Sequence, residues 1–127
     1  MEHAIKTVVL PNGIRLPYVE QGDPTGVPVL LLHGTSDSWR SYENVLPELP
    51  GWMRAIALTQ RGHGDADRPA TGYRAKDFAD DVVALMDALE IEKAIVVGHS
   101  MGGSIAQRFA IDHPARLLGL VLVGARA

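Results

Sequence analysis

The sequence predicts an α/β fold, in which a mainly parallel, doubly wound β-sheet carries helices on both faces. Two observations lead to this prediction. From residue 27 onward, short apolar runs alternate with segments whose apolar residues recur every three or four positions, in the order β-α-β-α-β-α-β. The runs at residues 27–32 and 118–123 are almost entirely apolar, as expected of strands that helices bury on both faces.

The composition is that of one globular domain. The 127 residues are 46% hydrophobic and 21% charged and include no cysteine, which excludes disordered, collagen-like and disulfide-dependent proteins. The net charge is -3 and no segment is strongly basic, so we expect no nucleic-acid partner. No apolar run approaches the ~20 residues that cross a bilayer, and no signal peptide is visible. These features favour a cytoplasmic protein that does not contact membranes.

The chain opens with two segments that alternate polar and apolar residues, at 6–10 and 14–20. The tripeptide between them, Pro11-Asn12-Gly13, has turn chemistry at hairpin spacing. We therefore expect an antiparallel pair of strands at one edge of the sheet.

Helices are predicted over residues 37–49, 74–90 and 101–112, and the strands around them over residues 27–32, 53–58, 94–97 and 118–123. The first helix has apolar residues at helical spacing, and Ser36 or Asp37 can cap its start. The second helix is amphipathic. The third follows a glycine-rich turn and ends before a proline.

The motif that carries chemistry is Gly98-x-Ser100-x-Gly102, between the strand at 94–97 and a helix. A serine hydroxyl is a weak nucleophile, and a sharp strand-to-helix turn is needed to lift it clear of the backbone. Such a turn strains Ser100 and brings positions 98 and 102 so close that side chains would collide, which glycine avoids. Gly103 lets the new helix pack closely on the sheet. The alternative is a glycine-rich turn whose serine only caps the helix.

Two backbone amides are candidates for an oxyanion hole. The amide of Met101 lies at a helix start, where unpaired donors and the helix dipole favour negative charge. In the loop after residue 32, the amide of Thr35 has room to turn inward beside Gly34. His33 in the same loop is interpreted as a histidine that hydrogen-bonds backbone, with a direct chemical role as the alternative. We expect neither a metal nor a cofactor.

Three segments together resemble the amino-terminal half of the α/β-hydrolase fold family, among its serine hydrolases of the esterase and haloperoxidase-like kind. They are the strand ending in His33-Gly34, RGHGDADRP at residues 61–69 and GHSMGG at residues 98–103. The resemblance implies that Ser100 is the nucleophile and that the amides of Met101 and Thr35 form the oxyanion hole. It also implies that the loop at 61–69 braces the pocket floor, with catalysis by one of its polar side chains as the alternative. Those side chains are His63, Asp65 and Asp67.

A serine at this turn also bears on the reaction that the resemblance implies. Relatives that cleave epoxides or carbon-halogen bonds place an aspartate there. Ser100 instead favours hydrolysis of a small carbonyl substrate: an ester, a thioester, a lactone or a carbon-carbon bond. The implied mechanism is acyl transfer through a serine ester.

In the family, the catalytic acid and histidine follow the serine on later strands, usually after an inserted lid. Only four residues follow Val123, and none is an acid or a histidine. We therefore expect residues 1–127 to form a single partial domain, truncated after about the sixth strand and without the lid. Two alternatives remain. One is a non-catalytic, truncated gene product, and the other is a nucleotide-binding Rossmann module, which the missing G-x-G-x-x-G spacing disfavours.

The remaining histidines are not expected to replace the missing base. His99 adjoins Ser100, but neighbouring side chains on a strand point to opposite faces, so we expect it to be buried and bonded to backbone. His3 and His113 are expected at the surface.

The last strand predicts self-association. In a truncated sheet, residues 118–123 form an edge that has no charge and no proline, the features that normally protect edges. We therefore expect a second copy to pair with it.

Overall fold

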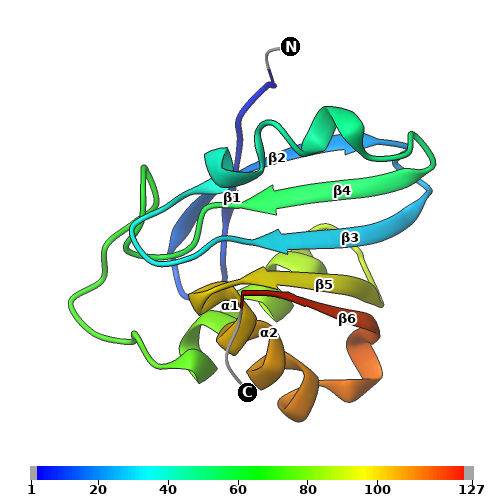
Figure 1. Ribbon diagram of the computed structural model, residues 1–127. Helices are drawn as coiled ribbons and strands as arrows, with labels where there is room; N and C mark the ends of the chain where they lie inside the picture. The colour runs from blue at the N-terminus through cyan, green and yellow to red at the C-terminus, as the bar shows by residue number, and fades with distance from the viewer. Residues whose placement is uncertain (1–2, 125–127) are drawn as a thin grey trace.

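The computed structural model describes residues 3–124, and its centre is a six-stranded sheet in the order β1-β2-β4-β3-β5-β6 (Figure 1). The strands are β1 Lys6–Val9, β2 Arg15–Gly22, β3 Val27–Leu32, β4 Met53–Leu58, β5 Ala94–His99 and β6 Leu117–Val123. Strands β4, β3, β5 and β6 run parallel, whereas β1 and β2 are antiparallel to their neighbours. The predicted mainly parallel sheet with a hairpin at one edge is confirmed.

Strand β3 shows why the sheet is buried on both faces. Leu30 and Leu32 belong to one hydrophobic cluster, whereas Val29 and Leu31 belong to a second cluster across the sheet. Successive side chains of a strand point to opposite faces, so an apolar run of this kind needs cover on each side.

Two α-helices, α1 at Ala75–Ala88 and α2 at Met101–Asp112, cover one face of the sheet (Figure 1). Phe78 and Val82 of α1 and Phe109 of α2 are buried in the same cluster as Leu30 of β3. Both helices match their predicted positions. Within residues 3–124, no helix combines the length and the apolar character that crossing a membrane requires.

The prediction of a single helix over residues 37–49 is wrong. This segment forms two short 3₁₀ helices, Trp39–Tyr42 and Leu46–Glu48, and Ser38 rather than either predicted residue caps the first of them. Pro47 explains the difference, because it has no amide hydrogen to continue an α-helical hydrogen-bond ladder. The apolar residues of this segment are buried nevertheless, because side chains of both 3₁₀ helices cover the second face of the sheet. A third 3₁₀ helix, Pro114–Arg116, links α2 to β6.

Candidate active site at the turn between β5 and α2

Ser100 lies in the tight turn between β5 and α2, with φ 56° and ψ -116°. A non-glycine residue rarely adopts a positive φ, and such a conformation persists only where the surrounding structure enforces it. The amide of Ser100 donates to the carbonyl of Val123 at 3.1 Å, and its carbonyl accepts from the amide of Gly103 at 2.9 Å. The predicted strain at Ser100 is confirmed. Its side chain makes no capping hydrogen bond to α2, contrary to the alternative of a helix cap.

The two flanking glycines are required by close backbone contacts. A Cβ atom added at Gly98 would overlap the carbonyl of Gly102, as the sequence predicts. A Cβ atom added at Gly102 would overlap the carbonyl of Leu32, at the end of β3. Gly103 is buried, and its Cα lies 2.6 Å from the position that a Cβ of residue 98 would take. The start of α2 therefore packs directly on the ends of β5 and β3.

A shallow depression of about 360 Å³ opens beside Ser100. It is lined by Thr35, Ser100, Met101, Ser104 and Gly124. The loop after β3 touches the turn, because a Cβ atom on Gly34 would lie 3.2 Å from the Cβ of Ser100. No hydrogen bond within residues 3–124 uses the amide of Thr35 or of Met101. Two unused amide donors thus border the same depression as the serine.

His33 is fully buried at the start of this loop. Its Nδ1 lies 2.8 Å from the carbonyl oxygen of Gly34, and its Nε2 accepts a hydrogen bond from the amide of Gln60 at 3.0 Å. Burial lowers the pKa of His33, and the nearby ring of His63 also lowers it, whereas the bond to Gly34 and the charge of Asp37 oppose these effects. Both ring nitrogens are bonded to backbone, as the first interpretation expects, so neither is free to act on a substrate.

The other histidines do not lie where they were expected. His99 is exposed rather than buried, although it is the last residue of β5 and pairs with Val123 of β6. His3 and His113 are half-buried rather than at the surface. His3 bonds Gln21 at 3.0 Å, and His113 lies 3.5 Å from Asp80 on α1.

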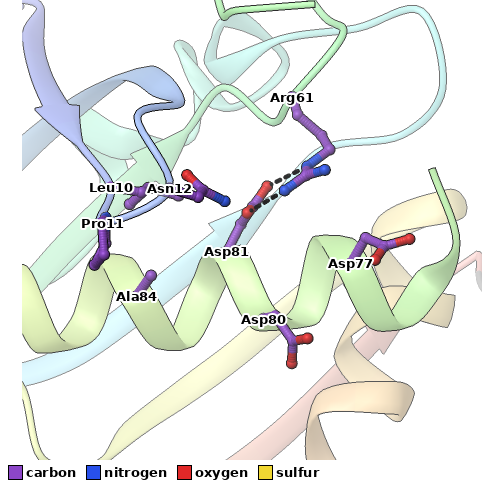
Figure 2. A pocket seen from close by; sticks show the side chains of 8 residues that line it. All are labelled: Leu10, Pro11, Asn12, Arg61, Asp77, Asp80, Asp81 and Ala84. Carbon is purple, nitrogen blue, oxygen red and sulfur yellow. Dashed lines mark hydrogen bonds and ion pairs between the residues drawn. The ribbon is translucent and has the colours of Figure 1, made fainter. Parts of the chain in front are cut away.

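An ion pair that the sequence analysis missed holds the loop at residues 61–69. Arg61 donates two hydrogen bonds of 2.7 Å to Asp81 on α1, and the two side chains are only 8% and 5% exposed (Figure 2). Burial raises the pKa of Asp81, while the hydrogen bonds from Arg61 oppose that shift. Arg61 also donates to the carbonyl of Gly72 at 2.9 Å. Asp81 comes three residues after Phe78, so its position on the apolar side of α1 was a signal available in the sequence.

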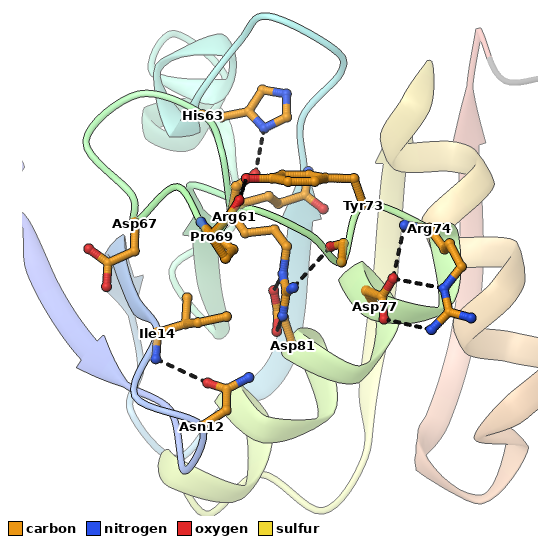
Figure 3. Close-up of polar contacts among 12 residues, drawn as sticks. Asn12, Ile14, Arg61, His63, Asp67, Pro69, Tyr73, Arg74, Asp77 and Asp81 are labelled. Atoms are coloured by element: carbon orange, nitrogen blue, oxygen red, sulfur yellow. Dashed lines mark hydrogen bonds and ion pairs between the residues drawn. The ribbon is translucent and has the colours of Figure 1, made fainter.

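Two further polar residues of this loop, His63 and Asp67, bond to backbone, and Figure 3 shows the bond of His63, whereas Asp65 is exposed. The ring Nδ1 of His63 lies 2.9 Å from the carbonyl of Arg61, and a carboxylate oxygen of Asp67 accepts from the amide of Arg15 at 2.8 Å. Together with the ion pair of Arg61 and Asp81, these contacts connect the loop to the hairpin and to α1. No group of three or more histidine and acidic side chains in residues 3–124 is arranged to hold a metal ion.

Comparison with known proteins assigns the chain to a family. A sequence model described as the alpha/beta hydrolase fold matches residues 27–127, most of the chain. The chain belongs to the α/β-hydrolase fold family. The resemblance stated from three motifs is therefore confirmed, and relatives named as hydrolases make this α/β-hydrolase chain part of an enzyme family.

Three α/β-hydrolase relatives illustrate the similarity. A soluble epoxide hydrolase from Corynebacterium sp. (strain C12) is 42% identical over 102 residues, which cover 80% of this chain and 35% of that protein. A 2-hydroxymuconate semialdehyde hydrolase from Pseudomonas sp. (strain CF600) is 39% identical over 121 residues, which cover 92% of this chain and 42% of that protein. The crystal structure of an esterase, RhEst1 from Rhodococcus sp. ECU1013, matches with a TM-score of 0.86 at 36% identity. The match covers 95% of this chain and 46% of the esterase. This chain spans less than half the length of each.

Proposed function

We propose that this α/β-hydrolase chain carries the nucleophile and the oxyanion hole of a serine hydrolase. The observation that supports the proposal most strongly is the enforced positive φ of Ser100 beside two amides that no hydrogen bond among the described residues uses. In the proposed reaction, the Ser100 hydroxyl oxygen attacks a carbonyl carbon as its proton passes to a base. The amides of Met101 and Thr35 then hold the negative charge that forms on the carbonyl oxygen. Expulsion of the leaving group gives an acyl-serine, which water hydrolyses.

The proposed substrate is an ester, a thioester, a lactone or a ketone whose carbon-carbon bond is cleaved. A serine that opened an epoxide would form an ether, which water does not readily cleave, whereas an aspartate forms an ester that water can hydrolyse. This chemistry favours acyl transfer for Ser100 despite the similarity to an epoxide hydrolase. The esterase and the semialdehyde hydrolase among the relatives agree with that choice by name. A cytoplasmic location stays a prediction from the sequence.

The general base and its acid partner are proposed to lie outside residues 3–124. Within these residues, no hydrogen bond joins a histidine ring to the hydroxyl of Ser100. The 127-residue chain should therefore hydrolyse p-nitrophenyl acetate at close to the uncatalysed rate, because a general base supplies about 10²–10⁴-fold. Fast turnover that Ser100→Ala abolishes would place a base within the chain and contradict this part of the proposal.

A fluorophosphonate tests the nucleophile without requiring turnover, because one reaction per molecule suffices, and imidazole added to the buffer supplies the general base that residues 3–124 lack. We expect the intact mass of the chain to increase by a single phosphonyl group, and Ser100→Ala to abolish the increase. Ser104→Ala is the matched control, since Ser104 is exposed and lines the same depression. Labelling that survives Ser100→Ala, or no labelling of the folded chain, would support the non-catalytic alternative.

A further inference from the structure

His33 has a single tautomer that fits its surroundings. The amide of Gln60 can only donate, so the Nε2 atom that it reaches at 3.0 Å must be the unprotonated nitrogen. The proton of the neutral ring then lies on Nδ1, which donates to the carbonyl of Gly34 at 2.8 Å. Gln60 also holds the peptide on the other side of Gly34, because its side-chain amide donates to the carbonyl of His33 at 3.0 Å.

The carbonyl of Gly34 determines where the amide of Thr35 points, because the two belong to one peptide group. No peptide bond in the described residues is cis, so this C=O and N–H point in opposite directions. The carbonyl faces the buried His33 ring and also accepts from the amide of Asp37 at 3.3 Å, across a turn that Ser36 completes with φ 64°. The Thr35 amide is thereby turned to the open side, where Thr35 lines the depression beside Ser100.

We propose that His33 is a positioning residue, whose Nδ1-protonated tautomer, selected by Gln60, aims the amide of Thr35 at the substrate oxygen. The inference rests on the proposed function of Ser100 and assigns His33 no contact with substrate. The geometry explains why a histidine stands at a fully buried position. It supplies a donor on one side of the ring and an acceptor on the other, a combination that a hydrocarbon side chain lacks.

The tautomer can be measured directly in the unmodified 127-residue chain. Long-range ¹H–¹⁵N NMR spectra of protein labelled with ¹⁵N-histidine should show the His33 ring neutral and protonated at Nδ1 at pH 7.5. A ring protonated at Nε2, or at both nitrogens, would overturn the proposal, because the Gly34 carbonyl or the Gln60 amide would then lack its partner. This measurement does not depend on any activity.

Two substitutions test whether the tautomer matters for the serine. His33→Phe keeps a flat ring but removes the donor, and should slow fluorophosphonate labelling of Ser100 by about 100-fold, the effect of losing one oxyanion donor. His33→Asn restores an amide donor near the place of Nδ1 and should recover most of that rate. If folded His33→Phe is labelled as fast as the unmodified chain, the positioning role is wrong while the role of Ser100 stands. If the unmodified chain is not labelled, the proposed function fails first, and the positioning role fails with it.

Discussion

At the scale of single residues, the backbone of Ser100 holds conformational strain at the point where the proposed chemistry takes place. Glycine adopts a positive φ without the steric cost that a Cβ atom brings, and strained residues of this kind cost about 1–3 kcal/mol. Ser100→Gly should therefore be about 1 kcal/mol more stable than Ser100→Ala, which keeps the Cβ atom. Urea unfolding of the two variants measures this difference. A glycine variant that is the less stable of the two would show that the turn does not strain residue 100.

The buried pair of Arg61 and Asp81 makes a second prediction at this scale. Asp81→Asn leaves the guanidinium of Arg61 buried without its counter-charge, and breaking a buried pair in this way costs about 3–5 kcal/mol. Asp80→Asn on the same helix is the matched control, because the pair of Asp80 with Lys76 is exposed and should contribute little. Equal unfolding free energies for the two variants would mean that Arg61 finds another partner.

His33 predicts a dependence of stability on pH. Its pKa is lowered in the folded protein from the ordinary value of 6.5, chiefly by burial and also by His63, with Gly34 and Asp37 opposing. The unfolded chain therefore binds a proton at higher pH than the folded chain does, so stability falls as pH falls below 6.5. Urea unfolding at pH 7.5 and 5.5 should show a larger loss for the unmodified chain than for His33→Asn. An equal loss would mean that His33 titrates alike in both states.

At the scale of elements, the turn between β5 and α2 depends on backbone contacts that leave no room for a side chain. Gly102→Ala should destabilise the protein strongly, because the added methyl group would overlap the carbonyl of Leu32 and push α2 away from β3. Gly51→Ala is the control, since open space surrounds that position. Thermal unfolding compares the two. A Gly102→Ala variant as stable as Gly51→Ala would show that the helix can shift at no cost.

An element could be predicted from the sequence when the residues that determine it are close together in the chain. The turn at Ser100 was predictable because its strand, glycines and helix are contiguous in sequence. The prediction of a helix over residues 37–49 was wrong because it rested on apolar spacing alone and ignored Pro47, which has no amide hydrogen for an α-helical bond. Asp81 was missed although its place on the apolar side of α1 was visible. The bonds of His33 to Gln60 join residues 27 positions apart, so no local pattern indicates them.

At the scale of the whole molecule, β6 is an edge strand of the described sheet, and most of its side chains are exposed. It pairs only with β5, and five of its aliphatic side chains are 39% to 54% exposed. They are Leu118, Leu120, Val121, Leu122 and Val123. An antiparallel pair of two β6 strands centred on Leu120 would place Leu118 opposite Leu122, so the strand is complementary to itself. We therefore propose that the 127-residue chain associates with a second copy through β6.

Charge on this strand tests the association. Leu120→Lys or Val121→Lys should shift the chain toward monomer, because a lysine on an edge opposes pairing with a like strand. Ile111→Lys is the control, since Ile111 is an exposed aliphatic residue on α2. Light scattering measures the mass of each variant. A monomeric unmodified chain, or a mass that neither β6 lysine changes, would contradict the proposed pairing.

In the proposed active site, Ser100 stands between two amides that bind the oxyanion. A crystal structure of the 127-residue chain after reaction with a fluorophosphonate would show whether they do. We predict a phosphorus atom bonded to the Ser100 Oγ, with its free oxygen about 2.7–3.1 Å from the amide nitrogens of Thr35 and Met101. Phosphorus on another side chain, or an oxygen turned to solvent away from both amides, would contradict it.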